Sequence, residues 1–360
     1  MKLEAFTSDA KPAYDMVVFC HLRWDFVYQR PQHLLSRLAE QYRILVVEEP
    51  VPYHGQGKPP FQVREINSNI HILQPPVAMP EIGVFLKKHL KNSNLMIGWF
   101  YSAAFVSVLD QLEFETVVYD CMDELSLFKG ASPELIDQEN ALLAAADFVY
   151  TGGKSLYESK KTKHHNVFCF PSSVDVQHFA NNRSKQVPED IKNIPHPIVG
   201  YYGVIDERID LELLKETAAK SPNSSFVMIG PLCKLEEHEL PRAENIYYLG
   251  MKSYDELPSY LHQFDIAMMP FALNDSTKFI SPTKTLEYMS AGKPIISTRI
   301  KDVERDYSHC TMLVDTAEDF AKYIHKPELN YQGAYTSILD NTSWDVTAEK
   351  MSSIIKKTLA

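Results

Sequence analysis

The chain has 360 residues, 45% hydrophobic and 11% aromatic, which is enough to bury two cores. Its net charge of −11 argues against a nucleic-acid-binding protein, because phosphate backbones are held by clustered Lys and Arg. Five scattered cysteines without a Cys-x-x-Cys pair are typical of reduced thiols, and the chain starts without an apolar signal segment. The longest uncharged run, 95–109, is too short to span a bilayer. We therefore expect a cytoplasmic protein.

Short apolar runs alternate with helix-length segments, such as 30–41 and 133–146, along most of the chain. The runs lie at 16–20, 43–48, 70–73, 95–99, 116–120, 147–152, 167–171, 197–203, 225–230, 245–250, 265–271, 293–298 and 311–315. Strands joined by helix-length connections form parallel sheets that are covered on both faces. The pattern predicts an α/β protein.

A break in this pattern at 185–197, with three prolines, is the best linker candidate. It predicts two Rossmann-like, doubly wound domains, 1–185 and 186–342. In such sheets ligands bind at the carboxyl ends of the strands, so we expect the two domains to face a cleft that holds the site.

The segment 281–297 carries the strongest functional signal. It predicts a helix that is entered through Pro282 and ends at Gly292, followed by a buried strand. Lys284 lies in the first turn, where the helix dipole favours an acid. This position makes sense if an anion binds at that end of the helix.

The backbone amides of Thr283, Lys284 and Thr285, together with one ammonium group, would form a phosphate site. Glu287 shares the face of Lys284 and could accept hydrogen bonds from a ribose diol. The alternative is an ordinary Lys–Glu pair on a solvated helix face, which stabilises by only about 0.2–0.5 kcal/mol.

Arg208 supplies a second cation, from a loop that follows the strand at 197–203. Two cations suit a diphosphate better than a single carboxylate, although Arg208 could instead pair with Glu207 or Asp210. The segment 250–254 ends another strand and could present backbone groups to a base.

Polar side chains also follow strands in the first half. His21, Arg23 and Arg30 surround the end of the first strand, where they suggest contact with sugar or phosphate or simple loop solvation. Asp120 and Asp123 follow the strand at 116–120, and Asp123 could instead cap a helix. Two carboxylates without His or Cys are a weak metal signal, so we expect no obligatory metal and no cofactor.

Four segments, 170–179, 249–271, 281–298 and 344–359, resemble the GT-B fold glycosyltransferases of group 1, which include bacterial mannosyltransferases and sucrose synthases. The resemblance implies a retaining, metal-independent transferase. Its donor would be a nucleotide-diphosphate sugar, with UDP favoured as the commoner nucleotide. Its acceptor would be a glycan or lipid-linked molecule in polysaccharide or cell-envelope glycan synthesis. The first domain would bind the acceptor and receive the C-terminal helix, 343–360, and the second would bind the donor.

The resemblance also suggests roles for single residues. Donor-binding residues would be Gly203, Arg208, Met251, Lys252, Pro282, Thr283, Lys284 and Glu287. We expect Asp120, Asp123 and His21 to be catalytic, and Arg23, Trp24 and Arg30 to bind the acceptor.

Two positions depart from the family pattern, since Phe279 stands where its first Glu is expected and Pro282 where it has glycine. The sugar and the stereochemical outcome are therefore open, and a non-catalytic nucleotide-sugar-binding subunit and a sugar-nucleotide epimerase are alternatives. The basic, partly apolar segment 84–92 is either a solvated face or a peripheral contact with an anionic membrane.

Overall fold

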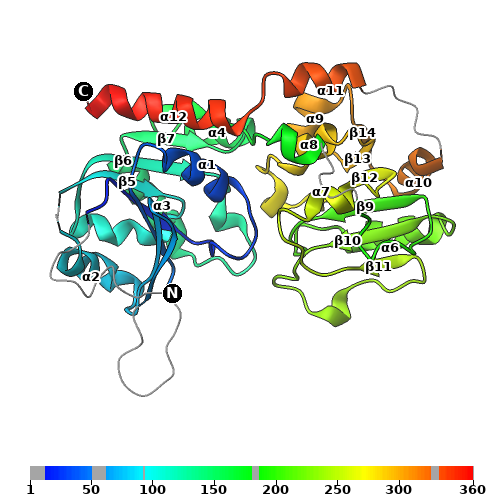
Figure 1. Ribbon diagram of the computed structural model, residues 1–360, viewed down its shortest axis with the longest axis horizontal. Coiled ribbons are helices and arrows are strands. Elements are labelled where there is room, and N and C mark those ends of the chain that lie inside the picture. Colours follow the sequence, from blue (N-terminus) through cyan, green and yellow to red (C-terminus); the bar gives the residue numbers. More distant parts are fainter. Residues whose placement is uncertain (1–12, 51–61, 92–93, 181–185, 326–331, 360) are drawn as a thin grey trace. The chain divides into compact units, whose positions relative to one another are not determined.

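The computed structural model describes residues 13–50, 62–91, 94–180, 186–325 and 332–359 (Figure 1). Its contacts divide the chain into two compact units. The first unit is Met1–Pro171 with Asp345–Ala360, and the second is Ser172–Trp344. Each unit is built around its own sheet.

The sheet of the first unit has eight strands in the order β3-β4-β2-β1-β5-β6-β7-β8. Their bounds are β1 (Met16–Cys20), β2 (Ile44–Glu48), β3 (Gln62–Asn67), β4 (Ile70–Gln74), β5 (Asn94–Phe100), β6 (Glu113–Cys121), β7 (Phe148–Thr151) and β8 (Val167–Cys169). All neighbours pair in parallel except β3 and β4. The sequence did not predict β3, because its residues, QVREIN, contain no apolar run.

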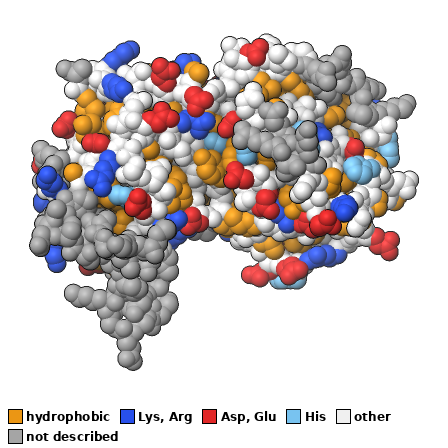
Figure 2. Space-filling view, in the orientation of Figure 1, with side chains coloured by type: hydrophobic (Ala, Val, Ile, Leu, Met, Phe, Trp, Pro, Cys, Tyr) orange, Lys and Arg blue, Asp and Glu red, His pale blue; other side chains and the backbone are white. Residues whose placement is uncertain are grey.

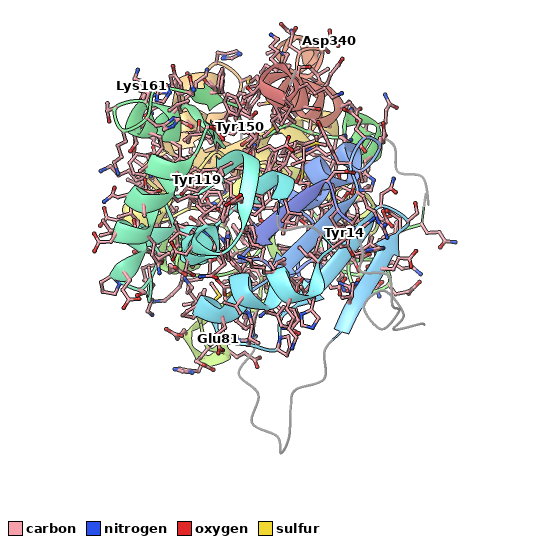
Figure 3. The ribbon with its side chains drawn as sticks, turned by 90° about the vertical axis from the view of Figure 1, so that its left-hand side faces the viewer. Tyr14, Glu81, Tyr119, Tyr150, Lys161 and Asp340 are labelled. Atoms are coloured by element: carbon pink, nitrogen blue, oxygen red, sulfur yellow. The ribbon has the colours of Figure 1, made fainter. Side chains whose placement is uncertain are left out.

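The helices of this unit include the C-terminal one. They are α1 (Arg30–Leu38), η1 (Met79–Glu81), α2 (Ile82–His89), η2 (Ala103–Asp110), η3 (Leu125–Leu127), α3 (Glu134–Ala145), α4 (Lys154–Lys160) and α12 (Trp344–Leu359). Tyr150 of β7, labelled in Figure 3, donates a hydrogen bond to the Met351 carbonyl of α12 at 3.0 Å. A further ion pair joins Arg37 of α1 to Asp345. These contacts fix α12 on the first unit.

The second sheet is entirely parallel, with the order β11-β10-β9-β12-β13-β14. Its strands are β9 (Ile198–Tyr202), β10 (Ser225–Ile229), β11 (Ile246–Tyr248), β12 (Ile266–Met269), β13 (Ile295–Thr298) and β14 (Met312–Val314). The chain runs from β9 outward to β11 and then returns to β12 on the other side of β9. This reversal is the point at which doubly wound sheets bind their ligands.

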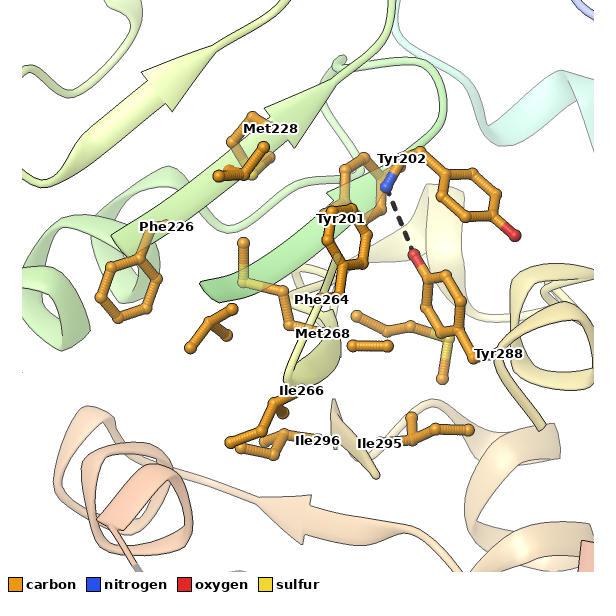
Figure 4. Packing of buried hydrophobic residues seen from close by; sticks show 14 of the residues in the cluster. Tyr201, Tyr202, Phe226, Met228, Phe264, Ile266, Met268, Tyr288, Ile295 and Ile296 are labelled. Carbon is orange, nitrogen blue, oxygen red and sulfur yellow. Dashed lines mark hydrogen bonds between the residues drawn. The ribbon is translucent and has the colours of Figure 1, made fainter. Parts of the chain in front are cut away.

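Helices form two groups around the second sheet, α6 with α10, and α5 with α7, α8 and α11. They are α5 (Val176–Ala180), α6 (Leu211–Lys220), η4 (Glu237–Glu239), α7 (Leu257–Leu261), η5 (Asp275–Thr277), α8 (Lys284–Ser290), α9 (Lys301–Tyr307), α10 (Ala317–His325) and α11 (Gln332–Leu339). The core between strands and helices is rich in aromatic and branched side chains (Figure 4). Gly200 of β9 belongs to this packing, because a Cβ there would lie 2.3 Å from the Phe264 ring.

The predicted fold class is confirmed, and every strand predicted from the sequence is present. The boundary between the units, however, lies at Pro171/Ser172 rather than at residue 185. The described part of the predicted linker, 186–197, belongs to the second unit because Ile191 and Ile194 are buried in its core.

The charges on the surface and the lengths of the helices bear on the predicted contact with a membrane. On the face drawn in Figure 2, acidic and basic side chains are intermixed. No helix within the described ranges is long and apolar enough to cross a membrane. In α2, Leu86 is buried while Val84, Lys87 and Lys88 are exposed, so only part of the predicted apolar membrane contact reaches the surface.

Candidate functional site

Glycines follow three adjacent strands of the second sheet. Gly203, Gly230 and Gly250 come after β9, β10 and β11, with φ angles of 139°, 147° and 68°. The Gly230 amide donates to the Gly250 carbonyl at 2.9 Å, and a Cβ on Gly230 would lie 1.9 Å from the Gly203 oxygen. Only glycine permits this approach of backbones at positive φ. Main-chain atoms therefore line the carboxyl ends of β9, β10 and β11, next to the point where the strand order reverses.

Lys284, the first residue of α8, extends over Gly203. A Cβ on Gly203 would lie 2.2 Å from Lys284 Cε and 2.6 Å from its Nζ. The same Nζ lies 5.5 Å from the Tyr201 ring centre and 5.9 Å from that of Phe271, within range of a cation–π contact. The structure thus holds this ammonium group between the ends of β9 and β12, and it brings together the predicted donor residues Lys284 and Gly203.

Glu287 lies one turn further along α8 and is 7% exposed. Its Oε2 accepts a hydrogen bond of 2.8 Å from the Tyr202 hydroxyl at the end of β9. Burial raises the pKa of Glu287, and both the Tyr202 hydrogen bond and the charge of Lys284 oppose that rise. The alternative of a Lys–Glu pair on a solvated helix face is therefore wrong, because the carboxylate is inside the unit.

Arg208 lies in the loop that follows β9. Its Nε and one terminal nitrogen donate to the Asp206 carboxylate at 2.9 and 2.6 Å, and its own amide also donates to Asp206, at 3.0 Å. The Arg208 carbonyl accepts from the Ala272 amide at 2.8 Å, which ties this loop to the segment after β12. Arg208 also lowers the pKa of Tyr201, opposing a larger rise caused by burial.

The two alternative partners of Arg208 have other contacts. Asp210 caps α6 by accepting from the Leu213 amide at 2.9 Å. Glu207 pairs with Lys234 at 3.1 Å. The guanidinium group is instead oriented by Asp206, which the sequence analysis did not identify.

The entry to α8 differs in one detail from the prediction. The Thr285 amide donates to the Pro282 carbonyl at 3.2 Å, so it is not available for a phosphate. The Thr283 hydroxyl lies 3.4 Å from that of Ser172. At the other end, Gly292 has a φ of 67° and ends the helix as predicted.

Met251 and Lys252 follow β11 at the edge of the sheet. Lys252 forms an ion pair with Asp190 at 2.6 Å, and its Nζ lies 5.1 Å from the Tyr260 ring centre. Met251 is 46% exposed. The side chain of Lys252 is thus held by the protein itself, whereas Met251 reaches solvent.

In the first unit, the predicted catalytic Asp120 and the predicted acceptor residue Arg30 bind each other. Both side chains are buried, and Arg30 donates to Asp120 at 2.8, 3.1 and 3.2 Å and to the Phe170 carbonyl at 2.8 Å. Burial raises the pKa of Asp120, and the guanidinium group opposes this rise. Both charges are enclosed and paired with each other, which supports a structural role for the pair; the catalytic role of Asp120 and the acceptor role of Arg30 stay predictions.

The loop after β1 is held by Glu48 at the end of β2. Arg23 donates to one carboxylate oxygen of Glu48 at 3.1 Å, and the Trp24 amide donates to the other at 2.8 Å. The contacts of Arg23 and Trp24 are thus those of a structured loop. They do not indicate an acceptor site.

His21, in the same loop, is different. Its Nδ1 is enclosed and has no hydrogen-bond partner among the described residues, and burial lowers the pKa of the imidazole to about 4. The ring is therefore neutral near pH 7. Asp123 is half-buried in the loop after β6. Within the described ranges, no cluster of three or more His, Cys, Asp or Glu residues could hold a metal ion.

Sequence reasoning missed three residues of the site in the second unit, Tyr202, Asp206 and Gly230. A signal existed for Gly230, because three successive predicted strands end in glycine. None existed for Tyr202, whose partner Glu287 lies 85 positions away.

Known proteins resemble this chain in sequence and in fold. Residues 196–326 match the family described as glycosyl transferases group 1. A Bacillus subtilis (strain 168) protein, provisionally named as a teichuronic acid biosynthesis glycosyltransferase, is 21% identical over 226 residues. That match covers 58% of this chain and 56% of the relative, so the chain spans about half the length of the curated relative.

Solved structures match nearly the whole chain. The sucrose-phosphate synthase of Thermosynechococcus elongatus has a TM-score of 0.72 at 14% identity, over 96% of this chain and 98% of its own. Anabaena HepE in complex with UDP and glucose has a TM-score of 0.68 at 11% identity, over 96% and 100%. A UDP-forming trehalose-phosphate synthase from Burkholderia xenovorans has a TM-score of 0.68 at 9% identity, over 97% and 100%. The chain therefore has the GT-B fold, and its residues 196–326 match the group 1 glycosyl transferases.

Proposed function

We propose that the protein transfers a sugar from a nucleotide-diphosphate sugar, with UDP favoured, to a glycan or lipid-linked acceptor in polysaccharide or cell-envelope glycan synthesis. The family match, the UDP in the names of two similar structures and the teichuronic acid relative support this function. The second unit would bind the donor and the first unit the acceptor.

The observation that carries the proposal is the position of Lys284 over Gly203 and beside Tyr201, with Arg208 in the loop that follows the same strand, β9. Two cations next to a main-chain surface suit a diphosphate, whose charge grows as the sugar departs. Pro282 and Thr283 would border the phosphates, Glu287 would accept from the ribose, and the segment at Met251–Lys252 would lie nearest the base. These assignments extend the group 1 pattern to the residues present in this chain.

We further propose that configuration is retained and that no metal is required. In a retaining transfer, the departing phosphate can accept the acceptor proton while Lys284 and Arg208 stabilise its charge. In an inverting transfer, a side chain such as His21 or Asp123 must act as base. With a pKa of about 4, His21 accepts a proton poorly, which favours the phosphate for this step.

The proposed location is the cytoplasm, with peripheral contact of the first unit to membranes. Exposed Val84, Lys87 and Lys88 on α2 support a weak contact of this kind. Co-sedimentation with vesicles that contain anionic lipid, before and after Lys87 and Lys88 are changed to Gln, tests it; equal binding by both proteins contradicts it.

The function is tested with a panel of UDP- and GDP-sugars, offered with and without oligosaccharide and lipid-linked acceptors and with or without EDTA. Transfer that persists in EDTA and preserves the anomeric configuration by NMR is expected. Tight nucleotide binding without turnover would favour the non-catalytic subunit. Conversion of the donor sugar without any acceptor would favour the epimerase.

A further inference from the structure

The hydroxyl of Tyr202 contacts the site but is not itself part of the predicted donor set. Tyr202 is 3% exposed, and its ring packs edge-on against Tyr288, with ring centres 5.1 Å apart, and parallel to Phe179 at 6.2 Å. Its amide donates to the Tyr288 hydroxyl at 3.3 Å (Figure 4). Both the backbone and the ring of Tyr202 are therefore fixed.

This fixed hydroxyl determines how the Glu287 carboxylate is turned. Oε2 accepts from Tyr202 at 2.8 Å, whereas Oε1 accepts no hydrogen bond from the described residues. A carboxylate with one oxygen anchored is restricted to a narrow range of orientations, and its other oxygen remains able to accept.

We propose that Tyr202 is a positioning residue of the donor site, whose hydroxyl anchors Glu287 Oε2 so that Oε1 receives the hydroxyl pair of a nucleoside ribose. The inference rests on the proposed function, because it specifies how the nucleoside of the donor is recognised. Tyr202 acts through Glu287 and does not itself touch the ligand.

Ionisable groups lie on the helix of this carboxylate and on the elements that contact it. Lys284 and Tyr288 lie on α8 itself and Tyr202 on β9, while the contacting helices α5 and α11 carry His178, which stacks on Tyr254, and Tyr335. Of these, Tyr202 and Lys284 oppose the rise that burial causes in the pKa of Glu287. A ribose hydroxyl needs an ionised acceptor, so nucleoside binding should weaken as pH falls through the pKa of Glu287. Removal of the Tyr202 hydroxyl raises this pKa further and moves the loss of binding to higher pH.

The test measures the affinity of UDP and of 2′,3′-dideoxy-UDP across pH 4.5 to 8 for wild type, Tyr202→Phe, Tyr150→Phe and Glu287→Gln, all as full-length chains. GDP and its dideoxy analogue replace them if the wild type selects GDP. We expect Tyr202→Phe to weaken UDP binding about three- to tenfold at pH 7.5. We also expect the loss of UDP binding on the acid side to begin at a higher pH than in wild type. Dideoxy-UDP should bind wild type and Tyr202→Phe equally well. Tyr150→Phe is the matched control, since it also removes a buried tyrosine hydroxyl that donates a hydrogen bond, to the Met351 carbonyl, but in the first unit.

Each contrary result has a distinct meaning. If the wild type binds neither nucleotide, the proposed function fails. Glu287→Gln could weaken UDP binding while Tyr202→Phe binds UDP like wild type and loses it at the same pH. The positioning role of Tyr202 is then overturned, and the donor site stands. If Tyr202→Phe weakens UDP and dideoxy-UDP equally, or changes thermal stability alone, its role is structural and the inference is again overturned.

Discussion

The two sheets share a reversal of strand order beside their first strand, yet their carboxyl edges differ. In the first unit the reversal lies between β1 and β5, and the nearby charges of Arg30 and Asp120 are buried against each other. In the second unit it lies between β9 and β12, where glycines leave main chain at the edge and Lys284 extends over it. A polar residue after a strand is therefore a weak guide to function until its partner is known.

The first unit contains a second example of charges that satisfy one another. Lys160 has a fully buried side chain and bonds to Glu124 at 2.8 Å and to Glu139 at 2.6 Å. Tyr119 also donates to Glu139, at 2.8 Å. Such networks orient loops and cost stability when broken, whereas Lys284 of the second unit lies over the main chain of Gly203.

The largest expected effect is that of Asp120→Asn, which leaves the Arg30 guanidinium buried without its counter-charge. Breaking a buried pair in this way costs about 3–5 kcal/mol, so amides of β1 and β6 should exchange with solvent roughly a hundred to several thousand times faster. Hydrogen exchange followed by mass spectrometry measures this loss in the first unit.

Asp25→Asn is the matched control for Asp120→Asn. Asp25 pairs with Arg64 at the surface of the same unit, with side-chain exposures of 70% and 39%, so its loss should cost less than about 1 kcal/mol. A stable Asp120→Asn protein that binds donor but fails to transfer sugar would make Asp120 catalytic after all.

The next effect concerns His21 and pH. Because burial lowers its pKa to about 4, the unfolded chain takes up this proton first, and stability falls as pH drops from about 6.5 towards 4. The shift corresponds to at most about 3 kcal/mol. Urea unfolding at several pH values should show that the free energy of unfolding falls less on the acid side for His21→Asn than for wild type. Parallel losses in both proteins would mean that His21 titrates as an exposed imidazole.

A smaller effect is expected for Gly203→Ala, which tests the space beneath Lys284. The new methyl group would meet the Lys284 side chain, so UDP binding should weaken about tenfold or more, in addition to a backbone cost of about 1–3 kcal/mol. Gly292→Ala is the control, because Gly292 also has a positive φ but no atom within 4 Å of the new Cβ. Equal UDP affinities for the two variants would mean that Gly203 is needed for its backbone conformation and not for the space beneath Lys284.

Much of the fold could be predicted from the sequence because parallel strands are buried on both faces and appear as apolar runs. The exception, β3, lies at the edge of its sheet and, among the described strands, pairs with β4 alone. The boundary at Pro171 was missed because the proline-rich segment looked like a linker, while its two isoleucines, Ile191 and Ile194, supply core contacts.

The candidate site was predictable where its signal is local. Lys284 and Glu287 belong to one short segment, and the glycines end predicted strands. Hydrogen bonds between residues far apart in the sequence were not predictable. Arg30 and Asp120 are 90 positions apart, and Tyr202 and Glu287 are 85 positions apart. Only the folded chain distinguishes a side chain that is used internally from one that faces a ligand.

The most direct test of the account is a calorimetric titration of UDP and GDP into wild type, Lys284→Ala and Lys215→Ala. Lys215 is an exposed lysine of α6 that pairs with Glu212 at 2.9 Å, so its removal controls for a simple change of net charge. A charge-assisted hydrogen bond contributes about 1.5–3 kcal/mol, so Lys284→Ala should bind the preferred nucleotide roughly ten- to a hundredfold more weakly, and Lys215→Ala should match wild type. Equal binding by all three proteins, or no binding by any, would contradict a donor site at the end of β9.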